Sequence, residues 1–273
     1  MASLALDAAG SPRIAYHDQR TFDLRFAARN GNLWARETLD ETGNMGAFCS
    51  LALDADGHCH ISYQDYTNGD LKYLTWTGTT YLIETVDFNS GTNVGQYTSL
   101  ALDAQGDPHI SYYSDGKLRY TVRTGGVWYG EEVPGASLSG FNTSLALDAG
   151  GDPRISYKDG NVLKYASKSG AVWTIETVDA TSGTGDYSSL KLDAQGAPHI
   201  AYYYFNRGDL RYAVKTGGTW TVETVDNGGQ INQTSEHDVG LHASLALDAQ
   251  GNPRIAYRDN TTWDLKYAEW GLH

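Results

Sequence analysis

The sequence contains little cysteine and no long apolar run. Only two cysteines occur among 273 residues, Cys49 and Cys59, which excludes a disulfide framework as the basis of the fold. Four to five residues of strand at about 3.3 Å each should hold the two thiols beyond disulfide reach. We therefore interpret both cysteines as unpaired, and they do not indicate a redox compartment.

Positive charge is also scarce, and this bears on partners. Lysine and arginine number 20 against 33 acidic residues, which gives a formal net charge of −13. A phosphate backbone would be repelled, so we expect no nucleic-acid partner, and without a long apolar run we expect no membrane insertion. The first residues, MASLALD, lack the basic and apolar regions of a secretory signal. Localisation stays open between the cytosol and, for a parent protein with an export signal, the cell surface or exterior.

What the chain does contain is one segment repeated six times. It reads SLALDAQGDPHISYY from Ser99, and lightly edited copies begin at residues 3, 50, 144, 189 and 244. Leu100 and Leu102 alternate with smaller residues, as do Ile110 and Tyr112, which is the two-residue period of strands. The intervening glycine and proline are typical of a turn. Each segment is therefore predicted to be a β-hairpin of two strands, a and b.

Two further strands follow in each copy. Strand c reads Asp-Leu-Arg/Lys-Tyr or a close variant, and strand d reads Trp-Thr-x-Glu-Thr-Val-Asp or a close variant in all copies but the last. The copies start 47, 49, 45, 45 and 55 residues apart, the length of one four-stranded propeller blade. We predict an all-β fold, a six-bladed β-propeller forming one domain over residues 1–273, whose last blade lacks its outer strand. That exposed edge favours self-association.

We expect the blade faces to differ in size. The leucines of strand a, Ile-x-Tyr of strand b and Leu-x-Tyr of strand c are predicted to share one large apolar face. Serine, alanine, aspartate and arginine or histidine would form the smaller face. The large face of one blade would then pack against the small face of the next.

The two sides of such a propeller differ in uniformity. The a-to-b and c-to-d turns are nearly the same in every copy, whereas the b-to-c and d-to-a connections vary. Because loops on a rigid scaffold carry binding residues, we predict a ligand site on the variable side. The predicted ligand-binding residues follow the strand b tyrosine or precede the recurrent serine: Gln64, Tyr97, Tyr113, Lys158, Tyr187, Tyr203, Tyr204, His242 and Arg258. Exposed tyrosines among amides and charges suit a sugar or another small polar ligand, unless they only cap the blade ends.

Three histidines indicate a second kind of site. The long connection from Asn227 to Ala243 carries Glu236, His237 and Asp238, and His242 follows, while His17 lies in the first copy. In a closed ring these groups would converge where the first and last blades meet. They would then serve as general acid or base, or hold a divalent metal. We otherwise predict no cofactor and no metal site.

Other residue patterns favour structural roles. An aspartate before each a-to-b turn is followed six residues later by arginine or histidine, as in Asp7 and Arg13. A site needed once would not be copied six times, so we expect a pair that closes the hairpin. His58-Cys59-His60 is a weak metal signal, because a strand points neighbouring residues to opposite faces. The adjoining Asp54-Ala55-Asp56-Gly57 resembles part of a calcium loop, but without its further carboxylates.

The repeat SLALDAxGxPxIxYxD, with LxYA and WxxETVD, resembles that of bacterial surface-type β-propeller repeat proteins. It is loosely akin to sialidase-type repeat propellers, although alanine stands where the sialidase Asp-box has serine or threonine. Six-bladed lectin propellers place arginine, glutamate and tryptophan between blades, and Arg25, Glu37 and Trp34 supply these types. The resemblance implies a carbohydrate-binding, lectin-like function. A hydrolase or polysaccharide lyase is the alternative, and a purely structural repeat is a third; whether the protein is an enzyme stays open.

Overall fold

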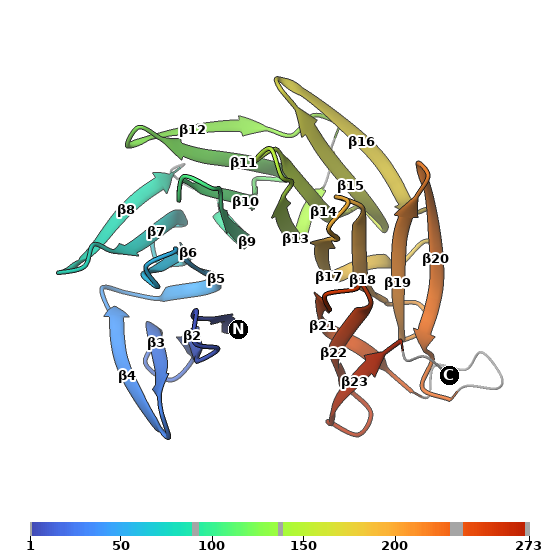
Figure 1. The fold of residues 1–273 in the computed structure, drawn as a ribbon, viewed down its shortest axis with the longest axis horizontal. Coiled ribbons are helices and arrows are strands. Elements are labelled where there is room, and N and C mark those ends of the chain that lie inside the picture. The colour runs from blue at the N-terminus through green and yellow to red at the C-terminus, as the bar shows by residue number, and fades with distance from the viewer. Residues whose placement is uncertain (1, 89–92, 136–138, 230–236, 271–273) are drawn as a thin grey trace. The chain divides into compact units, whose positions relative to one another are not determined.

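A computed structural model describes residues 2–88, 93–135, 139–229 and 237–270 (Figure 1). Twenty-three strands in these ranges form six antiparallel sheets, of which five have four strands and the last has three. No helix occurs there, and accordingly none that could cross a membrane. The predicted all-β class, a six-bladed β-propeller with an incomplete last blade, is confirmed.

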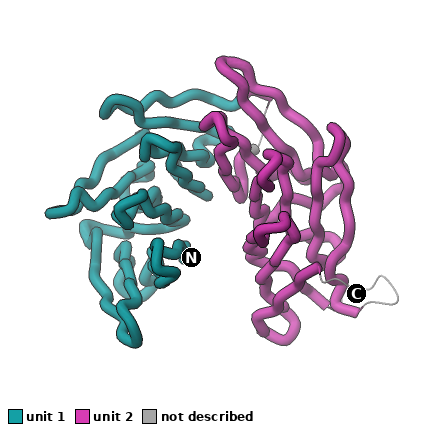
Figure 2. The backbone as a smooth tube through the Cα atoms, in the orientation of Figure 1, with its two compact units in different colours: residues 1–133 teal, residues 134–273 magenta. Residues whose placement is uncertain are grey.

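The chain divides into two compact units of three blades each, residues 1–133 and 134–273 (Figure 2). In unit 1 the blades comprise β1 (Ala2–Leu6), β2 (Pro12–Asp18), β3 (Asp23–Asn30) and β4 (Leu33–Asp40); β5 (Met45–Leu53), β6 (Cys59–Asp65), β7 (Asp70–Trp76) and β8 (Tyr81–Asp87); and β9 (Val94–Leu102), β10 (Pro108–Ser114), β11 (Lys117–Thr124) and β12 (Val127–Glu132).

Unit 2 contains the other three blades. These comprise β13 (Ser139–Leu147), β14 (Pro153–Asp159), β15 (Val162–Ser169) and β16 (Val172–Asp179); β17 (Thr184–Leu192), β18 (Pro198–Tyr204), β19 (Asp209–Thr216) and β20 (Thr219–Asp226); and β21 (Val239–Leu247), β22 (Pro253–Asp259) and β23 (Leu265–Glu269). In every blade the strands pair in chain order. That the two units make one domain stays a prediction.

The expected division of the blade faces is wrong for strand c. Opposed residues of an antiparallel ladder share a face, and Tyr73 on β7 pairs with Ser62 on β6 rather than with Tyr63. Leu71 likewise pairs with Gln64. The Leu-x-Tyr of strand c therefore lies with the small residues. The b-to-c turn determines which face of the blade each strand c residue lies on, and the sequence of strand c alone does not show it.

The repeated residues hold neighbouring blades together within each unit. The strand a serine accepts a hydrogen bond from a leucine amide of the next blade: Ser50 Oγ accepts from Leu100 N at 3.0 Å. The strand b tyrosine donates to the aspartate that ends strand d of the preceding blade, as Tyr202 does to Asp179 at 2.7 Å. Both cysteines are free and buried in the apolar cluster between the first two blades, and burial raises the pKa of the Cys49 thiol to about 12. Their unpaired state is as predicted.

Candidate functional site

The b-to-c and d-to-a connections lie on one side of each unit, as the sequence predicts. The backbone amide of Met45, where β5 begins, donates to Phe22 O in the b-to-c turn of the first blade, and Tyr66 N donates to Asn44 O. In unit 2, Val239 N donates to Gly208 O in the same way. We call this the variable side. The a-to-b turns lie at the opposite end of the same strands, and we call that end the turn side.

Strand a begins with a bulge on the variable side. Register shifts interrupt its pairing with strand b, for example between Ala47 and Ser50. Within the bulge, the residue two before the repeated serine has a left-handed backbone in five blades: φ is 54° at Phe48, 53° at Tyr97, 53° at Asn142, 52° at Tyr187 and 54° at His242. Bulky residues rarely adopt this region, and such strain clusters at ligand sites.

Neighbouring blades hold these strained residues in place. Thr98 Oγ1 donates to Phe48 O at 2.9 Å and also contacts Ser62 Oγ at 2.7 Å. In unit 2, Ser188 Oγ donates to Asn142 O at 2.8 Å. At Phe48 and Asn142 a hydroxyl group of the next blade thus holds the bulge backbone, although the two side chains differ.

In unit 1 the bulge residues form an aromatic cluster. The ring centroids of Phe48 and Tyr97 are 4.6 Å apart, and Tyr113 meets Tyr97 edge-on at 6.5 Å. All three side chains are half-buried, so part of each ring faces solvent. Such a surface can cover the C–H face of a small polar ligand.

Unit 2 brings aromatic and charged groups together. The Tyr187 and His242 rings are 4.2 Å apart, and Asp186 accepts from Lys158 at 2.5 Å and from Asn142 at 3.1 Å. Burial raises the pKa of Tyr187, and the nearby carboxylates of Asp186 and Asp238 add to this. Burial also lowers the pKa of His242, helped by the Arg258 cation. This cluster offers aromatic rings, carboxylates and cations within one unit.

Several of the predicted ligand-binding residues are buried, which corrects the expectation that they are exposed. Gln64 is 0% exposed and donates through Nε2 to Val94 O, and Tyr203 is 5% exposed and donates to Asp238. Tyr204, at 7%, lies beneath the Arg211 guanidinium. Gln64 and Tyr203, which follow the strand b tyrosine, thus bond to the next blade, a role that a single sequence does not show. Arg258 stacks over Trp263, 4.4 Å from its ring centre.

The three predicted histidines occupy different surroundings. His17, in unit 1, contacts Asn44 through Nε2 at 3.1 Å, and burial lowers its pKa. In unit 2, His242 stacks on Tyr187, whereas His237 lies beside the backbone at Gly208 and Gly228. Residues 230–236, Glu236 included, lie outside the described residues. Convergence of the three histidines stays a prediction.

On the turn side, all six predicted pairs form. The aspartate carboxylate lies 2.5 to 3.5 Å from the arginine or histidine six residues later: Asp7–Arg13, Asp54–His60, Asp103–His109, Asp148–Arg154, Asp193–His199 and Asp248–Arg254. The other carboxylate oxygen accepts two backbone amides of the turn, as Asp148 Oδ1 does from Gly150 and Asp152. These pairs close the hairpins.

The arginine, glutamate and tryptophan of the lectin resemblance also bond to protein groups. Glu84 accepts from Arg123 at 2.9 Å and from Trp128 Nε1 at 3.0 Å, both in the next blade. In the first blade Arg25 pairs with Asp18, and Glu37 accepts from Tyr81. Glutamate, tryptophan and an arginine from another repeat position thus meet between the second and third blades, whereas Arg25 bonds within its own blade.

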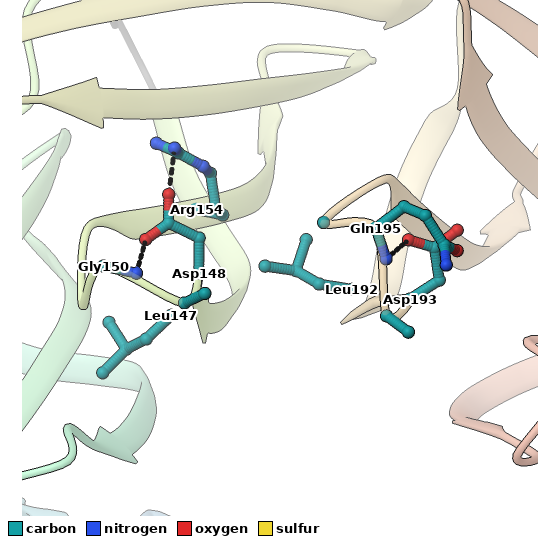
Figure 3. A pocket seen from close by; sticks show the side chains of 10 residues that line it. Leu147, Asp148, Gly150, Arg154, Leu192, Asp193 and Gln195 are labelled. Carbon is teal, nitrogen blue, oxygen red and sulfur yellow. Dashed lines mark hydrogen bonds and ion pairs between the residues drawn. The ribbon is translucent and has the colours of Figure 1, made fainter.

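Sequence reasoning missed a set of hollows on the turn side. One cavity of 490 Å³ lies between the a-to-b turns of the fourth and fifth blades, with Leu147, Asp148, Leu192 and Asp193 in its lining (Figure 3). Equivalent hollows of 310 and 410 Å³ separate the turns of the fifth and sixth and of the second and third blades. The uniform turn residues favour a structural interpretation, and a single sequence does not show the space between the turns of neighbouring blades. One hollow borders a group of potential metal ligands: Asp54, Asp56 and His58.

Comparison with solved structures shows the same fold in proteins of different kinds. A protein of unknown function from Dyadobacter fermentans matches with a TM-score of 0.66 at 13% identity, over 98% of this chain and 92% of that chain. An ulvan lyase of polysaccharide lyase family PL25 matches with a TM-score of 0.67 at 14% identity, over 97% and 78%. The NanB sialidase of Streptococcus pneumoniae gives 0.59 at 11% identity, over 97% and 66%. No family model and no curated protein matches the sequence.

Proposed function

We propose that the protein binds carbohydrate through the variable side of its blades, as a lectin-like module. The observation that carries this proposal is the strained bulge residue, which five blades place in the same left-handed backbone with different side chains. Strain of this kind costs about 1–3 kcal/mol at each residue and is characteristic of ligand sites. Two structural neighbours, the ulvan lyase and the sialidase, are named for acting on carbohydrate, which supports this class of ligand.

The predicted residues divide into two roles in this proposal. Tyr97, Tyr113, Tyr187 and His242 present ring surface, and Lys158 and Arg258 supply charge beside it. Gln64, Tyr203 and Tyr204 lie behind this surface and position it: they bond to the next blade or lie under an arginine. Ring faces that cover C–H groups and polar groups that bond hydroxyls are the usual means of sugar binding.

A glycan array followed by titration calorimetry on the whole chain tests this function. We expect binding of at least one sugar, weakened about 30-fold by Tyr97→Ala or Tyr187→Ala, as for the loss of a binding hot spot. Tyr129→Ala is the matched control, because Tyr129 is 60% exposed but lies on the outer strand β12. Binding of no sugar at millimolar concentration, or unchanged binding in both bulge variants, would contradict the proposal.

A hydrolase or polysaccharide lyase is the second candidate, and the unit 2 cluster favours it. Tyr187, His242 and Arg258 lie with two carboxylates in an arrangement whose side chains do not recur in the other described blades. A tyrosine and a histidine in contact could transfer protons to and from a sugar. Turnover of ulvan and of sialosides should be measured for the parent chain and for His17→Ala, His237→Ala and His242→Ala. Absence of turnover, or turnover unchanged in all three variants, would remove this candidate.

A further inference from the structure

The a-to-b turn of the second blade differs from the other five turns in its chemistry. Two residues after the repeated aspartate it carries Asp56, where the other copies have alanine, glutamine or glycine. Four residues after that aspartate it carries His58, where the others have serine, aspartate, alanine or asparagine. Both changes introduce side chains that bind metal ions.

The turn brings these side chains together. Potential ligand atoms of Asp54, Asp56 and His58 all lie within 4.8 Å of one another. Asp54 Oδ2 is 3.2 Å from His58 Nδ1, while Asp54 Oδ1 accepts the backbone amides of Asp56 and His58 at 3.0 and 2.8 Å. The Asp54 carboxylate is therefore held in position by the turn itself, with one oxygen directed toward the histidine.

We propose that this turn binds one divalent transition metal ion of the zinc type, with Asp54, Asp56 and His58 as ligands. Ligand atoms about 2.0–2.1 Å from a tetrahedral zinc ion lie about 3.4 Å apart, close to the observed 3.2 Å between Asp54 and His58. Asp56 is exposed, so its side chain is free to complete the set. Imidazole with carboxylate suits zinc and its neighbours better than calcium, which takes only oxygen ligands.

Two neighbours support the ligand set without joining it. His60 Nε2 lies 3.5 Å from Asp54 Oδ2, and its Nδ1 lies 2.5 Å from the Tyr73 hydroxyl. Outer partners of this kind orient the ligands of metal sites. Cys59 is buried in the apolar cluster of the first two blades, so its thiol does not join the ligand set, whereas His58 and His60 both lie beside Asp54.

The fourth blade shows the arrangement of the three turns that carry arginine. Asp148 Oδ2 accepts from the Arg154 guanidinium at 2.5 Å, and Gly150 stands in place of Asp56 (Figure 3). There the side-chain cation already balances the carboxylate. In the second blade, three ligands leave a fourth position for water, and the adjoining 410 Å³ hollow lined by Asp54 and Asp56 gives access to it.

The experiment uses the tag-free whole chain with zinc or cobalt ion alone, followed by titration calorimetry and metal analysis after dialysis. We expect one tightly bound ion per chain, and a cobalt spectrum without thiolate absorption. Asp56→Gln with His58→Ala, which installs the residue types of the fifth blade, should weaken binding at least about 100-fold, since loss of an outer partner alone costs 10–100-fold. Cys59→Ser and Asp107→Ala, the latter at the position of His58 in the third blade, should leave binding unchanged.

A gain of binding provides the converse test. Gln195→Asp with Ala197→His reproduces the ligand set beside Asp193 and His199 in the fifth blade, and should raise the stoichiometry to two ions per chain. No binding at about 100 µM metal, or equally tight binding after Asp56→Gln with His58→Ala in a chain that melts at the parent temperature, would overturn the proposal. Stoichiometry that stays at one in the fifth-blade variant would show that the turn does not suffice, and would also count against it.

Discussion

The turn end and the bulge end of the first hairpin differ in what recurs from blade to blade. At the turn side the side chains repeat: an aspartate pairs with arginine or histidine in all six blades. At the bulge the backbone repeats, while the residue that it presents is phenylalanine, tyrosine, asparagine or histidine. A repeated pair is explained by closing the hairpin. A repeated strained backbone with changing side chains opposes folding, and this difference is the basis on which we propose the bulge as the binding end.

The largest loss of stability should come from replacing the glycine that permits the bulge. Gly240 has a φ of +103°, and an added Cβ would lie 2.7 Å from Leu210 Cα in the preceding blade. We expect Gly240→Ala to lower the free energy of unfolding by about 3 kcal/mol, the sum of left-handed strain and overpacking. Gly106→Ala on the turn side is the matched control, because its φ is +82° with open space around it. Equal losses in urea unfolding would contradict this account.

At the turn side the largest loss should come from the aspartate. Asp148→Ala removes the acceptor of two backbone amides and of Arg154, and should destabilise the chain by about 2 kcal/mol. Its neighbour Asp152 contributes a backbone amide to this turn, so Asp152→Ala should change stability by less than about 0.5 kcal/mol. Sugar affinity should not change in either variant. A loss of affinity in folded Asp148→Ala would place the binding end on the turn side.

The strain itself can be measured at one bulge residue. Tyr97→Ala and Tyr97→Gly both remove the ring, but only glycine adopts a φ of 53° without penalty. We expect the glycine variant to be more stable than the alanine variant by about 1 kcal/mol, with equal loss of sugar binding. The matched pair is Tyr129→Gly against Tyr129→Ala on β12, where alanine should be the more stable. Alanine more stable than glycine at both positions would show that the bulge is not strained.

The sequence was sufficient for the blades because their signals are local. Two-residue alternation, the glycine turn and the spacing of the copies predicted all 23 strands in the described ranges, and the role of the Asp–Arg/His pairs followed from their sixfold repetition. The face of strand c was missed, because it depends on the number of residues that the b-to-c turn leaves unpaired. Tyr73 opposite Ser62 is the result.

The proposed ligand site stays a prediction, and the surroundings of its residues followed from the sequence only in part. The repeat shows that Phe48, Tyr97 and Tyr187 occupy equivalent positions two residues before the recurrent serine, but a sequence alone does not show their left-handed backbone. Gln64 and Tyr203 were expected at the surface because polar and phenolic groups usually reach water. They are buried because the next blade supplies partners in Val94 O and Asp238. Strand alternation makes His58-Cys59-His60 a weak metal signal, and Asp54-Ala55-Asp56-Gly57 lacks the further carboxylates of a calcium loop. A sequence alone does not show that the turn brings potential ligand atoms of Asp54, Asp56 and His58 within 4.8 Å of one another.

The smallest effect should come from acid acting on the turn side. Burial holds the pKa of His109 below its usual 6.5, outweighing the opposing influence of Asp103. The unfolded chain therefore binds this proton more readily, so the stability contributed by neutral His109 is present above pH 6.5 and is lost as pH falls below that value. His109→Arg installs the residue type of Arg154 in the fourth blade, which stays charged throughout. Between about pH 7.5 and 5.5 we expect the variant to lose less unfolding free energy than the parent, because the introduced arginine has no proton to gain in this range. Other histidines titrate in both chains, so the informative quantity is the difference between the two slopes of unfolding free energy against pH. Identical slopes would show that protonation does not affect the turn-side pairing.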